Sequence, residues 1–173
     1  MVSGQAWDIN FDSVVLYLFV SASLLFFTVT MVERKVNSFT VTVTFIMLYE
    51  LFCMVLQPHL TNYAFQPGLV NKFSWYVTWS MTSLCFVYLV YFSHSRLKLR
   101  ATNAAIFYCG LALLYSALQC MQYINSSTLK ISLLGDVYSS LVFAGNLLYI
   151  PVFALLWLKE RLKNRLSLDL VHS

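Results

Sequence analysis

Residues 14–35 read VVLYLFVSASLLFFTVTMVERK, an apolar run from Val14 to Val32 that ends at Glu33 and the basic pair Arg34 and Lys35. The run is close to the roughly 20 residues that a helix needs to cross a hydrocarbon core of about 30 Å. A helix is expected because the backbone polar groups of such a segment have to bond to one another in lipid. The stretch therefore predicts a membrane-spanning helix followed by a cationic flank.

Four more apolar runs of similar length follow along the chain, at residues 36–57, 73–93, 104–123 and 137–158. The composition agrees, since 60% of the residues are hydrophobic and 10% are charged, whereas soluble domains carry about 25% charged residues. The sequence thus predicts an all-α, polytopic membrane protein: a single membrane domain over residues 1–173, built as a bundle of five transmembrane helices. The expected location is a lipid bilayer, the inner membrane of a bacterium or a secretory-pathway or plasma membrane of a eukaryote.

The basic residues predict the orientation of this bundle. They cluster after the first, third and fifth runs, and Lys72 and Lys130 are the exceptions among the 11. Because positively charged loops stay on the cytoplasmic side of a membrane, the amino terminus is expected outside and the carboxyl terminus in the cytoplasm. The last cluster belongs to a basic tail, residues 159–173, which is expected to prolong the fifth helix or to lie on the inner leaflet.

Glu50 is the only acidic or basic side chain well inside a predicted span. A charged carboxylate near the centre of a bilayer costs about 2.5–3.5 kcal/mol on insertion scales, so such residues usually face the bundle interior. Two readings stay open. Glu50 belongs to a proton, ion or substrate pathway, or it is protonated or hydrogen-bonded within the bundle and locks the packing of the helices.

Other polar and aromatic side chains lie at depths that point to the outer half of the bundle. Gln57 shares a helix face with Glu50, Trp79 lies on the third helix, and Gln119 and Gln122 lie on the fourth. Together they predict a polar patch or an outward-open vestibule lined by aromatic rings. The alternative is that such residues belong to the interfacial belt of a membrane protein.

The fifth run contains Gly145, Asn146 and Pro151, which predict a kink near the middle of the membrane. Asn146 would lie close to the carbonyl groups that the kink loosens. Polar residues at a broken helix are typical of transporters, and an asparagine that bonds a neighbouring helix is the competing interpretation.

Few other motifs are present. The four cysteines lie inside spans without a CxxC pair, so no metal site and no cofactor is predicted; Cys53 and Cys120 lie at matched depths, and free thiols are expected. Asn125-Ser126-Ser127 matches the N-glycosylation acceptor pattern. The chain has five glycines and no GxxxG pair, which favours helix packing through large side chains.

The function classes follow from these observations. No nucleotide loop or nucleophile constellation appears, so no catalytic residue is predicted, and the basic residues serve topology and predict no nucleic-acid partner. The leading hypothesis is a small membrane protein that acts by binding, as a subunit, sensor or assembly factor for a membrane protein partner, a second copy or a small apolar ligand. A transporter or channel component that uses Glu50 for ion coupling is the alternative. A membrane enzyme acting on lipid or quinone, with Gln57, His59 and Trp75 at the headgroup level, is the third candidate.

Overall fold

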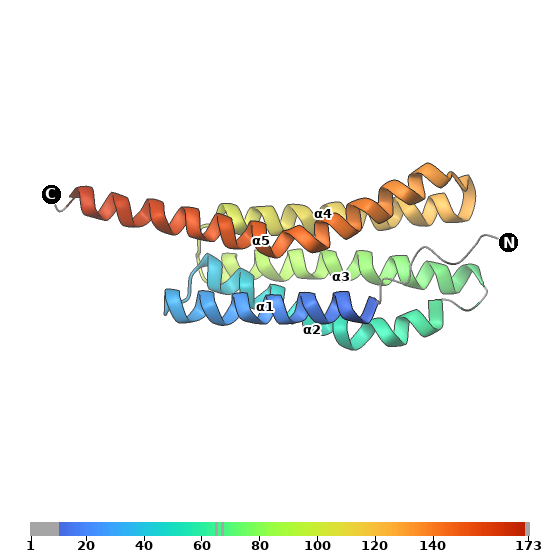
Figure 1. Ribbon diagram of the computed structural model, residues 1–173, viewed down its shortest axis with the longest axis horizontal. Helices are drawn as coiled ribbons and strands as arrows, with labels where there is room; N and C mark the ends of the chain where they lie inside the picture. Colours follow the sequence, from blue (N-terminus) through green and yellow to red (C-terminus); the bar gives the residue numbers. More distant parts are fainter. Residues whose placement is uncertain (1–10, 65, 67, 172–173) are drawn as a thin grey trace.

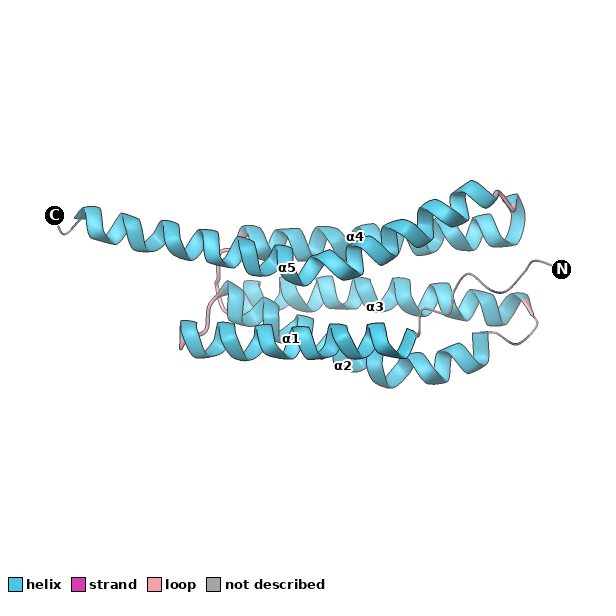
Figure 2. Ribbon diagram, in the orientation of Figure 1, coloured by secondary structure: helices cyan, strands magenta, loops and turns pink. Residues whose placement is uncertain are grey.

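Helices account for most of the chain. A computed structural model describes residues 11–64, 66 and 68–171 (Figure 2). The elements are α1 (Phe11–Glu33), α2 (Ser38–Ala64), α3 (Leu69–Arg96), α4 (Asn103–Ile124), the π-helical turn η1 (Asn125–Leu129) and α5 (Ser132–Val171). In this described part, five helices are long and apolar enough to cross a membrane. The all-helical architecture of five long apolar helices that the sequence predicts is therefore confirmed.

The outside of the bundle is apolar along its length. Leu24 is 64% exposed on α1, Met31 is 70% exposed near its end, and Leu155 is 65% exposed on α5. Soluble monomers rarely expose contiguous apolar patches of more than a few hundred Å². A surface of this kind suits contact with lipid chains, as expected for an integral membrane protein.

Neighbouring helices run antiparallel, and their connections gather at two ends (Figure 1). At the basic end lie the α1–α2 and α3–α4 connections, and α5 continues beyond them with Lys159, Arg161 and Lys163. At the distal end lie the α2–α3 connection and η1. α2 contacts α1, α3 and α4, while α5 contacts α4 and α1, so the helices close into a ring.

Several helices extend past the predicted spans. α2 continues to Ala64 with Pro58 inside it, and α3 begins at Leu69, which leaves a short connection where the sequence predicts a longer outer segment. Proline removes one backbone hydrogen bond and usually marks a helix end, but helices in membranes tolerate it where neighbouring groups satisfy the freed carbonyl. α5 begins at Ser132 and runs unbroken to Val171, so the basic tail prolongs this helix.

α5 remains helical through Pro151 and changes direction near its middle (Figure 1). The bend agrees with the kink predicted from Gly145 and Pro151. Proline bends a helix because its ring clashes with the preceding turn. The two halves of α5 therefore follow different directions along the bundle.

The half of the bundle nearest the basic end is filled by a hydrophobic core. All five helices contribute to it, and its buried side chains are Leu18, Ala22, Leu25, Val29, Phe39, Val43, Ile46, Val90, Ala104, Tyr108, Tyr149, Ile150, Phe153 and Trp157. Phe153 is fully buried and has the largest side chain among the residues with almost no exposure. Burial of these apolar side chains holds the five helices together in that half.

Polar contacts tie the helix ends together around this core. Ser38 Oγ at the start of α2 lies 2.8 Å from His94 Nε2 on α3 and 3.1 Å from Thr102 Oγ1 before α4. Trp157 Nε1 on α5 donates to Glu33 Oε1 on α1 at 2.8 Å. Buried hydrogen bonds of this type fix the rotation of each helix about its axis as well as its position.

The α3–α4 contact contains a pair of small polar side chains. Ser80 Oγ and Ser116 Oγ lie 2.6 Å apart in the buried space between the two helices. Small residues let two helix backbones approach closely. The Ser80–Ser116 contact therefore adds a buried polar link between α3 and α4.

Asn125 organises the turn between α4 and α5. It is 4% exposed, its Nδ2 donates to the Ile131 carbonyl at 3.1 Å, and its Oδ1 accepts from the Ile131 amide at 3.0 Å. Lys130 adopts the left-handed conformation with φ 55° and donates its amide to the Asn125 carbonyl at 2.7 Å. The acceptor pattern at residues 125–127 therefore lies in a folded turn with its asparagine side chain already engaged.

Candidate functional site

The half of the bundle nearest the distal end contains a cavity of about 500 Å³. It lies between all five helices and reaches from residues near the distal connections to the middle of the bundle. The residues that line it are Val14, Val15 and Leu18; Tyr49, Glu50, Cys53, Gln57 and Ala64; Lys72, Trp75, Tyr76, Trp79 and Ser83; Tyr115, Gln119 and Ser126; and Tyr138, Ser139, Val142, Phe143 and Asn146. The cavity occupies the part of the molecule for which the sequence predicts a vestibule.

Glu50 lies at the inner end of this cavity, near the middle of α2. Its side chain is 4% exposed, and its Oε1 accepts a hydrogen bond of 2.6 Å from the Tyr149 hydroxyl of α5. Tyr149 is itself 5% exposed. The bond joins two residues that are 99 positions apart in the sequence. It is the only hydrogen bond that the Glu50 carboxylate makes within the described residues.

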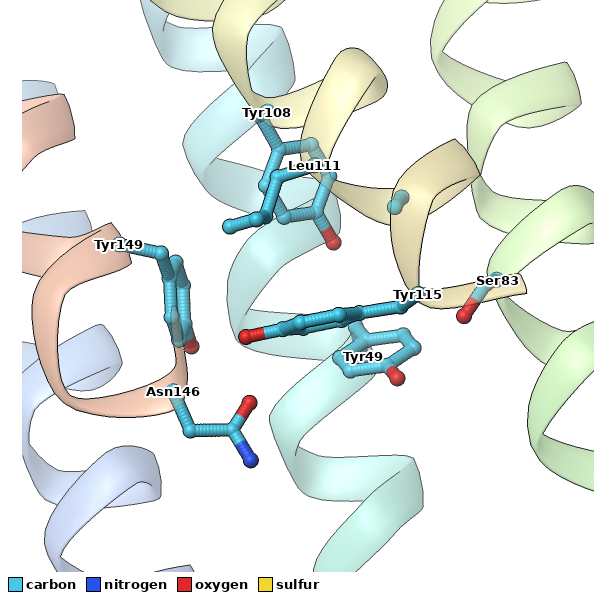
Figure 3. A pocket seen from close by; sticks show the side chains of 8 residues that line it. Tyr49, Ser83, Tyr108, Leu111, Tyr115, Asn146 and Tyr149 are labelled. Atoms are coloured by element: carbon cyan, nitrogen blue, oxygen red, sulfur yellow. The ribbon is translucent and has the colours of Figure 1, made fainter. Parts of the chain in front are cut away.

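Several tyrosines gather near the inner end of the cavity. Tyr49, Tyr108, Tyr115 and Tyr149 line a small chamber of about 20 Å³ beside the main cavity, together with Asn146 (Figure 3). A volume of this size is enough for a single water molecule among polar groups. The inner end of the cavity therefore combines a carboxylate, phenol hydroxyls and an amide in an otherwise apolar setting.

Asn146 points into the space between α4 and α5 (Figure 3). It is half-buried and lines both the chamber and the main cavity. Its amide group makes no hydrogen bond with another described residue. A half-buried amide that faces a cavity in this way can donate to or accept from a ligand.

Gly145 makes room for Tyr115. A Cβ atom at position 145 would collide with the Tyr115 hydroxyl oxygen and lie 2.9 Å from the ring carbon that carries it. The Tyr115 hydroxyl also lies 3.5 Å from the Val142 carbonyl of α5. The glycine thus lets a ring from α4 rest against the α5 backbone and form one wall of the cavity.

Nearer the distal end, the cavity wall is aromatic with a few polar groups. The rings of Trp75 and Trp79 meet edge to face, with centroids 5.7 Å apart. Tyr138 donates to Gln119 Oε1 at 3.0 Å and so links α5 to α4. Small-molecule sites in proteins commonly pair a mostly apolar wall with a small number of placed polar groups.

The structure brings together most of the candidate residues named from the sequence. Glu50, Gln57, Trp79, Gln119 and Asn146 all line the cavity. Gln122 is not among the lining residues: its Oε1 accepts from Asn125 Nδ2 at 3.4 Å near the α4–α5 turn. Whether any of these residues binds a ligand stays a prediction.

Tyr149 and Ser83 contribute to the site without having been singled out from the sequence. Tyr149 is the hydrogen-bond donor to Glu50, and Ser83 lines both cavities. A tyrosine in an apolar run has no distinctive pattern of its own. Its position three residues after Asn146 was the available signal, since residues i and i+3 share a helix face.

Within the described residues, no three His, Cys, Asp or Glu side chains come together as a metal site would require. Cys53, Cys85, Cys109 and Cys120 are free thiols. Neither a protein-family model, nor a curated protein, nor a solved structure matches this chain. The cavity is therefore the feature of this chain that bears on its function.

Proposed function

We propose that this protein is an integral membrane protein that binds a small, largely apolar molecule in the cavity at the distal half of the bundle. The volume of the cavity is the main support for this proposal. At about 500 Å³, it lies within the range of about 300–1,000 Å³ that is usual for small-molecule sites. Aromatic rings form much of its wall, and Glu50, Gln119 and Asn146 supply polar groups. A protein of this kind acts as a ligand sensor or as a binding subunit of a larger membrane assembly.

We further propose that the basic end faces the cytoplasm and that the cavity opens toward the other side of the membrane. The concentration of Lys and Arg at one end of the bundle supports this orientation through the positive-inside rule. The amino terminus would then lie outside. The membrane would be the inner membrane of a bacterium, or a secretory-pathway or plasma membrane of a eukaryote.

A cavity-filling variant tests the binding function. Ser139 lines the cavity, whereas the adjacent Ser140 is exposed on the outside of α5 and does not line it. Ser139→Phe places a ring inside the cavity, and Ser140→Phe adds the same ring on the lipid-facing side. Small molecules that co-purify with the native protein in mild detergent are identified by mass spectrometry and compared between the two variants.

We expect the native protein and Ser140→Phe to retain the same compound, and Ser139→Phe to lose most of it. The proposal is wrong if both folded variants retain the compound equally, because the bound molecule would then lie outside the cavity. Helical content and elution as a single species establish that each variant is folded.

A transport function is the second candidate, and the contrast between the two halves of the bundle favours it. The cavity reaches the middle of the bundle and stops at the hydrophobic core, as in a transporter that is open to one side. In proteoliposomes, a carrier coupled through Glu50 would exchange a labelled ligand, and Glu50→Gln would abolish that exchange. Binding without any exchange favours the sensor or subunit function.

A further inference from the structure

The charge of the cavity is uneven along its length. Glu50 lies at the inner end, and among the described residues that line the cavity the only basic one is Lys72, one turn into α3 at the distal end. At a rise of about 1.5 Å per residue, the two positions are roughly 15 Å apart along the bundle. The other titratable groups on the wall are tyrosines and Cys53. The inner end of the cavity thus carries an acidic group that has no cationic partner among the described residues.

The Glu50 carboxylate is also short of hydrogen-bond donors. Tyr149 donates to Oε1, and no described residue donates to Oε2. Glu50 lines the cavity. In the described chain, Oε2 is not among the fully buried side-chain atoms that lack a hydrogen-bond partner, so this oxygen is accessible from the cavity. A carboxylate removed from water is stabilised by a counter-ion or by further donors. A ligand that enters the cavity can supply both.

The walls near Glu50 suit an organic cation. Tyr49 and Tyr115 line the inner end, and Trp79 lies on the facing helix. Aromatic rings present a negative face that attracts ammonium groups, and tryptophan does so most strongly. The side-chain amide oxygen of Asn146 offers an additional hydrogen-bond acceptor in the same space.

The same features disfavour other ligand classes. In its ionised form Glu50 repels an anionic group at the inner end of the cavity. A divalent metal ion takes several oxygen ligands, whereas no cluster of three His, Cys, Asp or Glu side chains occurs in the described chain. The cavity is also much larger than a bare ion and largely apolar. These constraints leave a molecule with an apolar body and a positively charged head.

From this geometry we infer that the ligand is an amphiphilic amine, with its ammonium group against Glu50 and its apolar body along Trp75 and Trp79. The inference rests on the proposed binding function and specifies the class of ligand. Glu50 serves as the counter-ion, Tyr149 holds the carboxylate in position through Oε1, and Oε2 is left to the ligand.

The test uses three compounds with one skeleton: phenylbutylamine, phenylbutanol and phenylbutyrate. At neutral pH they are a cation, a neutral molecule and an anion, because an alkylamine is protonated and a carboxylic acid is ionised. Binding to the full-length protein in nanodiscs of zwitterionic lipid is measured by calorimetry, with empty nanodiscs as the control for partition into lipid. Glu50→Gln removes the charge and keeps an oxygen that can accept from Tyr149.

We expect the amine to bind the native protein at least about tenfold more tightly than the alcohol, and phenylbutyrate to bind more weakly than either. In Glu50→Gln the amine should bind no more tightly than the alcohol, and the affinity for the alcohol should be unchanged. Asp136→Asn is the matched control, since Asp136 is an exposed acid on α5 that does not line the cavity. This variant should keep the preference for the amine.

Each other outcome decides against the inference in a distinguishable way. Equal binding of amine and alcohol to the native protein overturns the amine assignment and leaves the proposed binding function in place. A preference for the amine that persists in folded Glu50→Gln shows that another group is the counter-ion. Failure of all three compounds to bind overturns both the inference and the proposed function. The comparison on the native protein needs no variant, so it remains decisive if Glu50→Gln does not fold.

Discussion

Gly145 and Tyr115 show how one missing side chain shapes the cavity. The Tyr115 ring of α4 occupies the space where a side chain at position 145 would begin. From the sequence, Gly145 indicates a flexible point in α5. The structure adds a steric reason for glycine, because even a methyl group there would force the ring to move.

The first prediction concerns this contact. Gly145→Ala should destabilise the protein by about 1–3 kcal/mol, since extra volume in a packed site forces side chains out of their preferred positions. The matched control is Gly110→Ala on α4, where a Cβ atom would meet nothing within 4 Å. Unfolding of both variants in graded SDS is followed by circular dichroism. Equal stability of the two variants would contradict the steric role of Gly145.

The hairpin of α4, η1 and α5 depends on hydrogen bonds from one asparagine. Asn125 bonds to both the amide and the carbonyl of Ile131 and closes the turn that reverses the chain. The neighbouring Ser127 is different, since its Oγ is buried without a hydrogen-bond partner. The two positions offer a matched pair within a single turn.

The second prediction compares these two positions. Asn125→Ala should lower the stability by about 1–3 kcal/mol, because it removes both hydrogen bonds between the Asn125 side chain and the backbone of residue 131. Ser127→Ala should stay within about 0.5 kcal/mol of the native protein or raise its stability, since it removes an unsatisfied polar group. Unfolding in graded SDS measures both. A larger loss in Ser127→Ala than in Asn125→Ala would contradict the assignment of the turn.

At the scale of the whole molecule, the bundle is divided into a filled half and a hollow half. The hydrophobic core of α1 to α5 fills the half near the basic end, while the cavity lies in the distal half. The hydrogen bond from Trp157 to Glu33 joins α5 to α1, where the ring of helices closes.

The third prediction concerns the orientation of the whole molecule. A reporter that fluoresces only in the cytoplasm should be active when it is fused after Ser173, and a reporter that is active only outside should be silent there. The expected result follows from the Lys and Arg residues at the basic end. The opposite pattern would place the mouth of the cavity on the cytoplasmic side. Fusion before Met1 should give the reverse of the result at Ser173 and serves as the control.

The sequence predicted much of the architecture and part of the candidate site. Hydropathy and charge are properties of single segments, so they indicated five apolar helices and grouped the basic residues at alternate connections. Depth along a helix is also local, since each residue adds about 1.5 Å. For this reason Gln57, Trp79, Gln119 and Gln122 could be assigned to the outer half of the bundle, and Asn146 to a kink near its middle, before their contacts were known.

Only the tertiary structure decided which side chains meet. The rotation of each helix about its axis depends on contacts with all its neighbours, and no single segment encodes it. That rotation placed Tyr149 against Glu50, left Gln122 near the turn and away from the cavity, and set Tyr115 over Gly145. The sequence by itself determined an apolar five-helix bundle with one basic end, because burial in lipid is a property of each segment. The cavity depended on how the five helices pack together.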